Sequence, residues 1–260
     1  MGREWLSHFH PDERGFADKA EEWIERAALA HTVKVTDFLD PRQAEIVQSL
    51  ANRYGGQAAL RFDGGYPEAE RRRAILTPDY RDPENEDPGI AVLAVSSGDD
   101  RLSGLDHGDY MGALLGLGVK REKVGDFQVR PDGCHVLVAS EIADFLNLQL
   151  RQVSRVHVLT ELLPLDRLIA VPAVLEEMTL SVASMRLDGI VSDVCRLSRA
   201  KAQQPIQAGR CRVNWKPEED PSTPLKAGDT VSLQGFGRFR ILSAELTKKE
   251  RYRVRVGRFV

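Results

Sequence analysis

Residues 185–202 read MRLDGIVSDVCRLSRAKA, and this stretch decides the fold of the C-terminal part of the chain. Four apolar side chains in it recur at the spacing of one face of a short helix: Leu187, Ile190, Val191 and Val194. Ser198 is then a good N-cap for a second helix, and Gly209 can end it. The stretch therefore predicts two short helices in succession.

The residues that follow predict a small sheet for these helices. Residues 210–215 form a strand that enters a turn at Asn214, and residues 225–229 form a turn before a strand over Thr230–Leu233. Pro205 lies inside the second helix, where proline removes a backbone hydrogen bond at a cost of about 3 kcal/mol. We expect that helix to kink or to end early.

The motifs along this region occur in a fixed order. They are Arg186-Leu187-Asp188, Ser198-Arg199, Ile206-x-x-Gly209, Val213-Asn214 and Gly228-Asp229. In this order they resemble the S4 RNA-binding domain, in which two short helices pack on a small bent sheet and basic residues grip structured RNA. Guanidinium forks and a helix N-terminus both suit phosphate. The RNA contacts that the resemblance implies are Arg186, Arg196, Ser198, Arg199, Lys201, Arg210 and Arg212.

Charge is distributed unevenly along the chain. Residues 181–260 hold 16 Lys and Arg against 8 Asp and Glu, a net charge of +8. The whole chain carries -3, so the remainder carries -11. A basic C-terminal domain on an acidic body suits a polyanionic partner. Charge alone leaves RNA, DNA and anionic lipid open, as well as a solvated basic face.

Two further stretches alternate arginine with apolar residues. They are residues 235–241 and 251–256, and in each the arginines fall on one face of a strand. One interpretation is an extended basic sheet edge that follows a phosphate backbone. The other is charge that protects an edge strand from pairing with other chains.

Residues 1–80 predict a helical N-terminal region. Asp40-Pro41 reads as an N-cap followed by proline at the first helical position. Arg71, Arg72 and Arg73 read as a solvated helix face, with an auxiliary RNA contact as the alternative. The expected elements are helices over 12–30 and 40–54, a short strand over 58–62 and a helical segment over 67–76.

A polar linker over 78–89 leads to a middle domain at 89–165. Its expected elements are strand 90–95, helix 109–117, strands 127–130 and 134–139, helix 141–148 and strand 153–159. This β-α-β-β-α-β order is that of a ferredoxin-like fold, which RNA-recognition motifs share. The strand over 134–139 has no aromatic residue, so we do not expect bases to stack on this sheet. With an S4 domain at 181–260, the fold class is α+β.

A second resemblance covers nearly the whole chain. It rests on FLDPRQ at 38–43, GGYP at 64–67 and HGDYMGALLGLGVKREKVGD at 107–126. These stretches look like the YlmH family of bacterial S4-domain proteins. The resemblance implies a helical N-terminal region, an RNA-recognition-like middle domain and a C-terminal S4 domain. It also implies a role on the large ribosomal subunit in the rescue of obstructed peptidyl-tRNA complexes, with ribosomal RNA as partner and transfer RNA as a second candidate.

The last of these stretches holds two further candidate sites. Lys120, Arg121 and Lys123 follow a helix end, where they could hold a phosphate or simply complement the helix dipole. His107 and Asp109 could suggest acid–base chemistry, but their place at a loop–helix junction favours capping.

The main alternative is an RNA-modifying enzyme with its active site in residues 1–160 and the S4 domain as a targeting module. Glycine-rich nucleotide-binding loops are missing from the sequence, and His8 and His10 lack a partner cluster for a metal ion. Three scattered cysteines fit a reducing cytosol, and no apolar run is long enough for a membrane helix. We therefore expect a cytoplasmic RNA-binding protein with no catalytic residue, cofactor, metal ion, small-molecule substrate or membrane partner.

Overall fold

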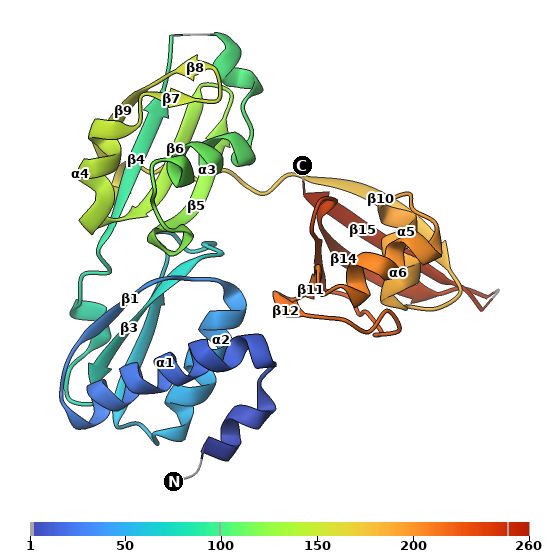
Figure 1. Cartoon of the computed structure of the whole chain (residues 1–260), viewed down its shortest axis with the longest axis horizontal. Helices are drawn as coiled ribbons and strands as arrows, with labels where there is room; N and C mark the ends of the chain where they lie inside the picture. The colour runs from blue at the N-terminus through green and yellow to red at the C-terminus, as the bar shows by residue number, and fades with distance from the viewer. Residues whose placement is uncertain (1–2, 99, 249, 260) are drawn as a thin grey trace. The chain divides into compact units, whose positions relative to one another are not determined.

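The computed structural model describes residues 3–98, 100–248 and 250–259. The chain divides into two compact units, with the boundary between Val171 and Pro172. Figure 1 shows the elements of each unit. Within the described ranges, no helix is long and apolar enough to cross a membrane.

The first unit begins with helices and a three-stranded antiparallel sheet. The elements are η1 (Arg3–His8), α1 (Pro11–Leu29), β1 (Lys34–Leu39), α2 (Pro41–Arg53), β2 (Ala58–Asp63) and β3 (Arg72–Pro78). The sheet order is β1-β3-β2. Asp40 caps α2 as predicted, because its side chain accepts from the Gln43 amide at 2.8 Å. The helices pack on the sheet through a core that includes Ile24, Leu50 and Leu76.

The helical prediction for residues 67–76 is wrong. The second half of that segment belongs to β3, the central strand of this sheet, and Ala74, Ile75 and Leu76 are fully buried in it. Strand β1 was also not predicted. Both helices and the short strand at 58 are present, so the N-terminal region is a two-helix layer on a sheet. The linker over 78–89 is a loop with one short turn, η2 (Pro83–Asn85).

The middle of the first unit has the predicted ferredoxin-like topology. Its main strands are β4 (Ile90–Ser96), β5 (Val124–Arg130), β6 (Gly133–Ala139) and β9 (Leu159–Leu163), in the antiparallel order β5-β6-β4-β9. The helices are α3 (His107–Gly116) and α4 (Ser140–Gln149), and the short elements are η3 (Asp100–Gly104), η4 (Arg121–Lys123), β7 (Gln152–Val153), β8 (Val156–His157) and η5 (Leu165–Arg167). The predicted last strand at 153–159 is instead the small β7–β8 pair, and β9 follows it.

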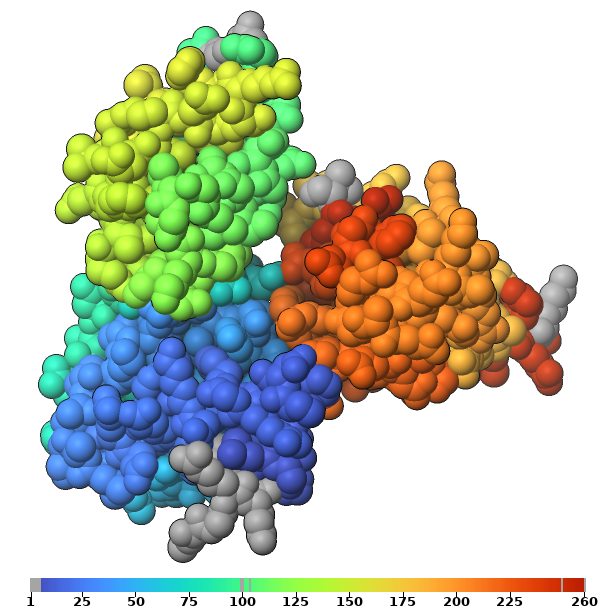
Figure 2. Space-filling model, in the orientation of Figure 1, coloured from blue at the N-terminus to red at the C-terminus, as the bar shows by residue number. Residues whose placement is uncertain are grey.

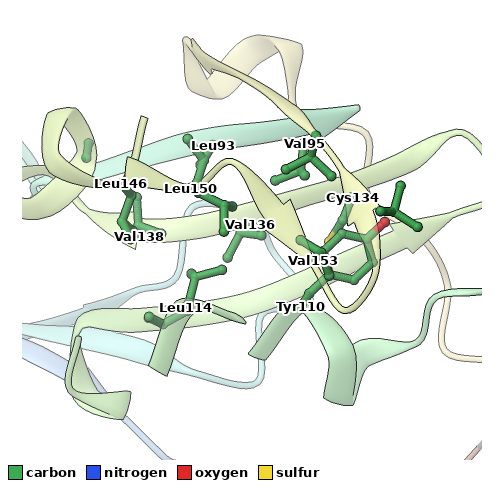
Figure 3. Close-up of a cluster of buried hydrophobic side chains, with 14 of the residues drawn as sticks. Leu93, Val95, Tyr110, Leu114, Cys134, Val136, Val138, Leu146, Leu150 and Val153 are labelled. Carbon is green, nitrogen blue, oxygen red and sulfur yellow. The ribbon is translucent and has the colours of Figure 1, made fainter. Parts of the chain in front are cut away.

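One face of this sheet packs on α3 and α4. Figure 3 shows the core between them, with Leu93, Val95, Val136 and Val138 from the strands meeting Tyr110, Leu114 and Leu146 from the helices. The turn before β6 depends on Gly133, whose φ is +143°. A Cβ there would lie 2.1 Å from the carbonyl oxygen of Val95, so only glycine fits.

The opposite face of the same sheet is covered by the protein itself. Ile90 and Leu137 pack against Phe38 of the N-terminal sheet and against η5. His135 is 5% exposed, and its Nδ1 accepts from the Ile169 amide at 3.2 Å. This is the face on which RNA-recognition motifs stack bases. Its burial agrees with the expectation that bases do not stack here.

The second unit is a six-stranded antiparallel sheet with two helices on one face. The elements are β10 (Leu175–Val182), α5 (Leu187–Val194), α6 (Arg199–Gln207), β11 (Cys211–Val213), β12 (Lys216–Pro217), β13 (Thr230–Leu233), β14 (Gly237–Leu246) and β15 (Tyr252–Phe259). The strand order is β10-β15-β14-β13-β11-β12. The helices bury Ile190, Val191 and Ile206 against Phe239 and Val254 of the sheet.

Three expectations for this unit need correction or extension. The domain was predicted from residue 181, and β10 extends its sheet back to Leu175. The helix with Pro205 continues to Gln207, and the Arg210 amide then donates to the Pro205 carbonyl at 2.9 Å. Strands β14 and β15 were predicted as a sheet edge, but both have neighbours on either side.

Candidate nucleic-acid interface

A buried carboxylate organises the two helices of the second unit. Asp188 is 0% exposed and lies in the first turn of α5. It accepts from Arg186 through Nε at 3.2 Å and Nη2 at 3.1 Å, and from Arg199 through Nε and Nη2, both at 3.0 Å. Gln203 of α6 adds a hydrogen bond of 2.8 Å. Asp188 therefore links Arg186, which precedes α5, to Arg199 and Gln203 of α6.

The protonation of Asp188 follows from these contacts. Burial by itself raises the pKa of a carboxyl group, but the hydrogen bonds from Arg186, Arg199 and Gln203 hold the pKa of Asp188 well below its usual range. The ionised carboxylate orients both guanidinium groups. Their side chains stay 38% and 57% exposed, so each still presents N–H donors to solvent.

The turn between the helices carries three more predicted contacts. Ser198 caps α6, since its hydroxyl accepts from the Lys201 amide at 3.3 Å. Arg196 sits at the turn with a φ of +53°. Arg196 and Lys201 are both exposed, and the described part of the chain offers neither of them an ion pair.

Arg210 is exposed just ahead of β11, but Arg212 lies on a different surface. Its neighbour Cys211 is buried among the helix-facing residues, and side chains alternate along a strand. Arg212 therefore projects from the sheet face that has no helices, which separates it from the predicted set. We call five of the predicted residues, which lie on or beside α5 and α6, the helix face: Arg186, Arg196, Ser198, Arg199 and Lys201. Figure 2 shows α6 and the following residues, in orange, at the surface of this unit.

The basic residues after α3 have mainly internal partners. Lys123 Nζ lies 2.6 Å from Asp37 and 2.7 Å from Glu141. Arg121 donates to the carbonyls of Val124 and Gly125, and burial followed by the charge of Arg71 lowers the pKa of Arg121 to about 10. Of the three predicted phosphate contacts here, Lys120 is the exposed one.

The arginine triplet of the first unit is not a solvated face. Arg71 donates to the carbonyls of Val124 at 3.2 Å and Phe38 at 2.9 Å. Arg73 is 5% exposed and donates to the carbonyls of Thr36 and Gly89. These side chains join the N-terminal sheet to the middle domain, so the prediction of a solvated triplet is wrong and an RNA contact by Arg73 is excluded by burial.

Of the two candidate acid–base residues, Asp109 takes part in a helix cap and His107 packs against an aromatic ring. Asp106 caps α3 and accepts from the Asp109 amide at 3.0 Å, and Asp109 accepts from the Asp106 amide at 3.1 Å. The His107 ring packs edge-on against Phe127 at 4.6 Å. His10 likewise caps α1. In the ranges that the structure describes, no group of three His, Cys, Asp or Glu side chains could hold a metal ion.

A cavity of about 390 Å³ in the first unit bears on the enzyme alternative. Its lining includes two carboxylates, Asp63 and Glu84. Asp63 lies 2.7 Å from Nη1 of Arg61, and Glu84 lies 3.7 Å from Nε of the same arginine. Arg61 is therefore an ion-pair partner of both carboxylates in this lining.

Comparison with known proteins agrees with this division of the chain. Family models match in three places: "YlmH, N-terminal" at residues 12–81, "Putative RNA-binding domain in YlmH" at 83–167 and "S4 domain" at 185–231. A Bacillus subtilis (strain 168) protein, "Ribosome-associated protein quality control protein P2", is 39% identical over 249 residues, which are 95% of each chain. The chain belongs to the YlmH family.

A solved YlmH structure supports the same assignment. The "Cell division protein ylmH from Streptococcus pneumoniae" matches with a TM-score of 0.54 and 25% identity, covering 62% of this chain and 97% of that chain. Both resemblances seen in the sequence, to the S4 domain and to YlmH, are confirmed.

Sequence reasoning missed the residues that build the helix face. The Arg186-Leu187-Asp188 motif gives no role for Asp188, and no motif includes Gln203. A signal was present, because Asp188 lies next to Leu187 and before Ile190 and Val191 at the start of an otherwise apolar helix. An acidic residue in that position needs cationic partners if it is buried.

Proposed function

We propose that this chain is a non-catalytic, ribosome-associated RNA-binding protein that grips structured RNA with the helix face of its second unit. The observation that carries the proposal is the Asp188 arrangement. It presents Arg186 and Arg199 in fixed orientations beside the exposed Arg196 and Lys201 at the start of α6. Oriented guanidinium forks and a helix N-terminus are the chemistry that binds RNA phosphates.

The partner that we propose is ribosomal RNA of the large subunit, with transfer RNA as a second candidate, in quality control of obstructed ribosomes in the cytoplasm. The Bacillus subtilis relative, at 39% identity, is described as ribosome-associated and as a quality control protein, which supports this choice. The S4 match over residues 185–231 supports the surface. Of the residues after α3, Lys120 is proposed as an additional contact, and Arg121 and Lys123 as positioning residues for it.

Sucrose-gradient sedimentation of the full-length chain in a cell lysate tests this proposal. The test variant is Arg196→Gln with Lys201→Gln, which removes two exposed charges and leaves the Asp188 contacts in place. The control is Arg26→Gln with Lys34→Gln, which removes two exposed charges from the first unit.

Wild type and control should travel with large ribosomal subunits at moderate salt, and the test variant should stay largely at the top of the gradient. Wild type that stays at the top would contradict the ribosome as target. A test variant that sediments like wild type would contradict the helix face as the binding surface.

A further inference from the structure

The sheet of the second unit has a second basic surface, on the side away from α5 and α6. Phe239, Ile241, Val254 and Val256 face the helices, so the residues that alternate with them face the other way. Cross-strand pairs place Arg240 opposite Thr230 and Arg238 opposite Ser232 on this side. We call this surface the sheet face: Arg212, Trp215, Arg238, Arg240, Arg253, Arg255 and Phe259.

Aromatic rings and guanidinium groups interleave on this surface. The guanidinium carbon of Arg238 lies 4.1 Å from the ring centre of Phe259 and 5.9 Å from that of Trp215. Arg240 lies 5.5 Å from the same Phe259 ring. Arg240 Nε also donates to the Thr230 hydroxyl at 3.1 Å, which holds its plane. The result is a short series of flat groups, with Phe259 on β15, Arg238 and Arg240 on β14, and Trp215 in the turn after β11.

Exposed arginines continue the surface along β15. Arg253 and Arg255 lie two residues apart, so both project on the same side, and both are exposed. Arg255 pairs with Glu177 at 2.6 Å, and that pair is about half exposed on each side. The five arginines of the sheet face are opposed on the same side by Glu177 and Glu245, which leaves a positive balance.

We propose that the sheet face binds an unpaired stretch of RNA, while the helix face holds the structured part. The inference rests on the proposed RNA-binding function and extends it to a second surface. Single strands bind where a positive groove or sheet carries flat side chains on which bases stack, because stacking needs exposed bases and tolerates any sequence. A paired helix hides its bases, so the flat groups on this surface favour an unpaired strand.

Fluorescence anisotropy with the full-length chain and two labelled RNAs tests this inference. One RNA is an unstructured oligonucleotide of about a dozen nucleotides, and the other is a stable hairpin with a minimal loop. The sheet-face variant is Arg253→Gln with Arg255→Gln. The helix-face variant, Arg196→Gln with Lys201→Gln, is its matched control because it removes the same charge from the same unit.

The sheet-face variant should bind the oligonucleotide about tenfold more weakly than wild type and the hairpin less than twofold more weakly. The helix-face variant should show the reverse order. A third variant, Phe259→Leu, keeps the charge but removes the ring. It should weaken oligonucleotide binding about fivefold with an unchanged salt dependence.

Other outcomes would overturn the inference. Equal losses for both RNAs in the sheet-face variant would mean a contact to backbone phosphates of paired RNA. If a polyglutamate peptide at equal charge concentration displaced the oligonucleotide, the sheet face would be a binding surface for an acidic protein instead of RNA. If wild type binds the hairpin but not the oligonucleotide, the inference fails and the proposed function stands; if it binds neither, the proposed function fails.

Discussion

Two arginines of the triplet in the first unit and three arginines of the second unit have opposite environments. In the acidic first unit, Arg71 and Arg73 donate to backbone carbonyls and join the N-terminal sheet to the middle domain. In the basic second unit, Arg196, Arg253 and Arg255 are exposed. Arg71 and Arg73 of the triplet therefore serve folding in the first unit, and scattered arginines form the candidate binding surfaces of the second. The number of arginines in a segment says less about RNA binding than the partners that their side chains have.

The largest expected effect comes from removing Arg73, whose guanidinium group bonds to backbone carbonyls inside the first unit. Arg73→Ala leaves the carbonyls of Thr36 and Gly89 without their donor and removes a cation 3.5 Å from Glu141. We expect a loss of about 3–5 kcal/mol in the opening free energy of the first unit, because Arg73 and its partner Thr36 are buried. Hydrogen exchange of the β3 amides measures it.

The matched change in the second unit is Arg253→Ala, which should alter the opening free energy of β15 by less than about 0.5 kcal/mol because the side chain is exposed. If Arg73→Ala and Arg253→Ala lowered the opening free energy by similar amounts, the contrast between the buried arginine and the exposed one would be false.

The next effect concerns Asp188, a buried charge that holds two partly exposed arginines. Asp188→Asn should cost the second unit about 2 kcal/mol, below the usual cost of breaking a buried pair because Arg186 and Arg199 are partly exposed. Hydrogen exchange of α5 amides reports the change. Asp193→Asn on the exposed side of the same helix is the control and should cost less than about 0.5 kcal/mol.

Acid should lower the stability of the second unit by protonating Asp188. The pKa of Asp188 in the folded protein is depressed, so its contribution is complete above the unfolded value of about 3.9 and is lost as the pH falls below it. The urea midpoint of the second unit, followed by NMR signals of β13, should therefore fall as the pH is lowered from about 4 to about 2. The fall should be smaller in Asp188→Asn, and equal falls would exclude Asp188 as the cause.

Much of the fold could be predicted where a few neighbouring residues determine it. The Asp40 and Ser198 caps depend on local contacts, and both are in place. The hydrogen-bond partners of Arg71 and Arg73 could not be predicted, because they are carbonyls of residues 16 to 53 positions away. The face of Arg212 depends on strand register, which the pairing of β11 with β13 determines.

The smallest expected effect is on the salt dependence of RNA binding, and it distinguishes Lys120 from Lys123, two lysines that follow α3. Lys120→Gln should reduce the salt dependence of RNA binding by roughly one phosphate contact, because this side chain is exposed. Lys123→Gln should leave it unchanged, because that ammonium group lies between Asp37 and Glu141. Titrations of a structured ribosomal RNA fragment at several salt concentrations would show the difference. Equal effects would mean that Lys123 leaves its internal partners to reach RNA.

The most direct test of the helix face is the salt dependence of that same titration, with wild type beside Arg196→Gln/Lys201→Gln. The logarithm of the binding constant falls linearly with the logarithm of salt concentration, by roughly 0.7–0.9 per neutralised phosphate. The double variant should bind more weakly, and its slope should be shallower by about 1.4–1.8. An unchanged slope would mean that neither side chain contacts phosphate, and the RNA-binding surface would then have to lie elsewhere on the chain.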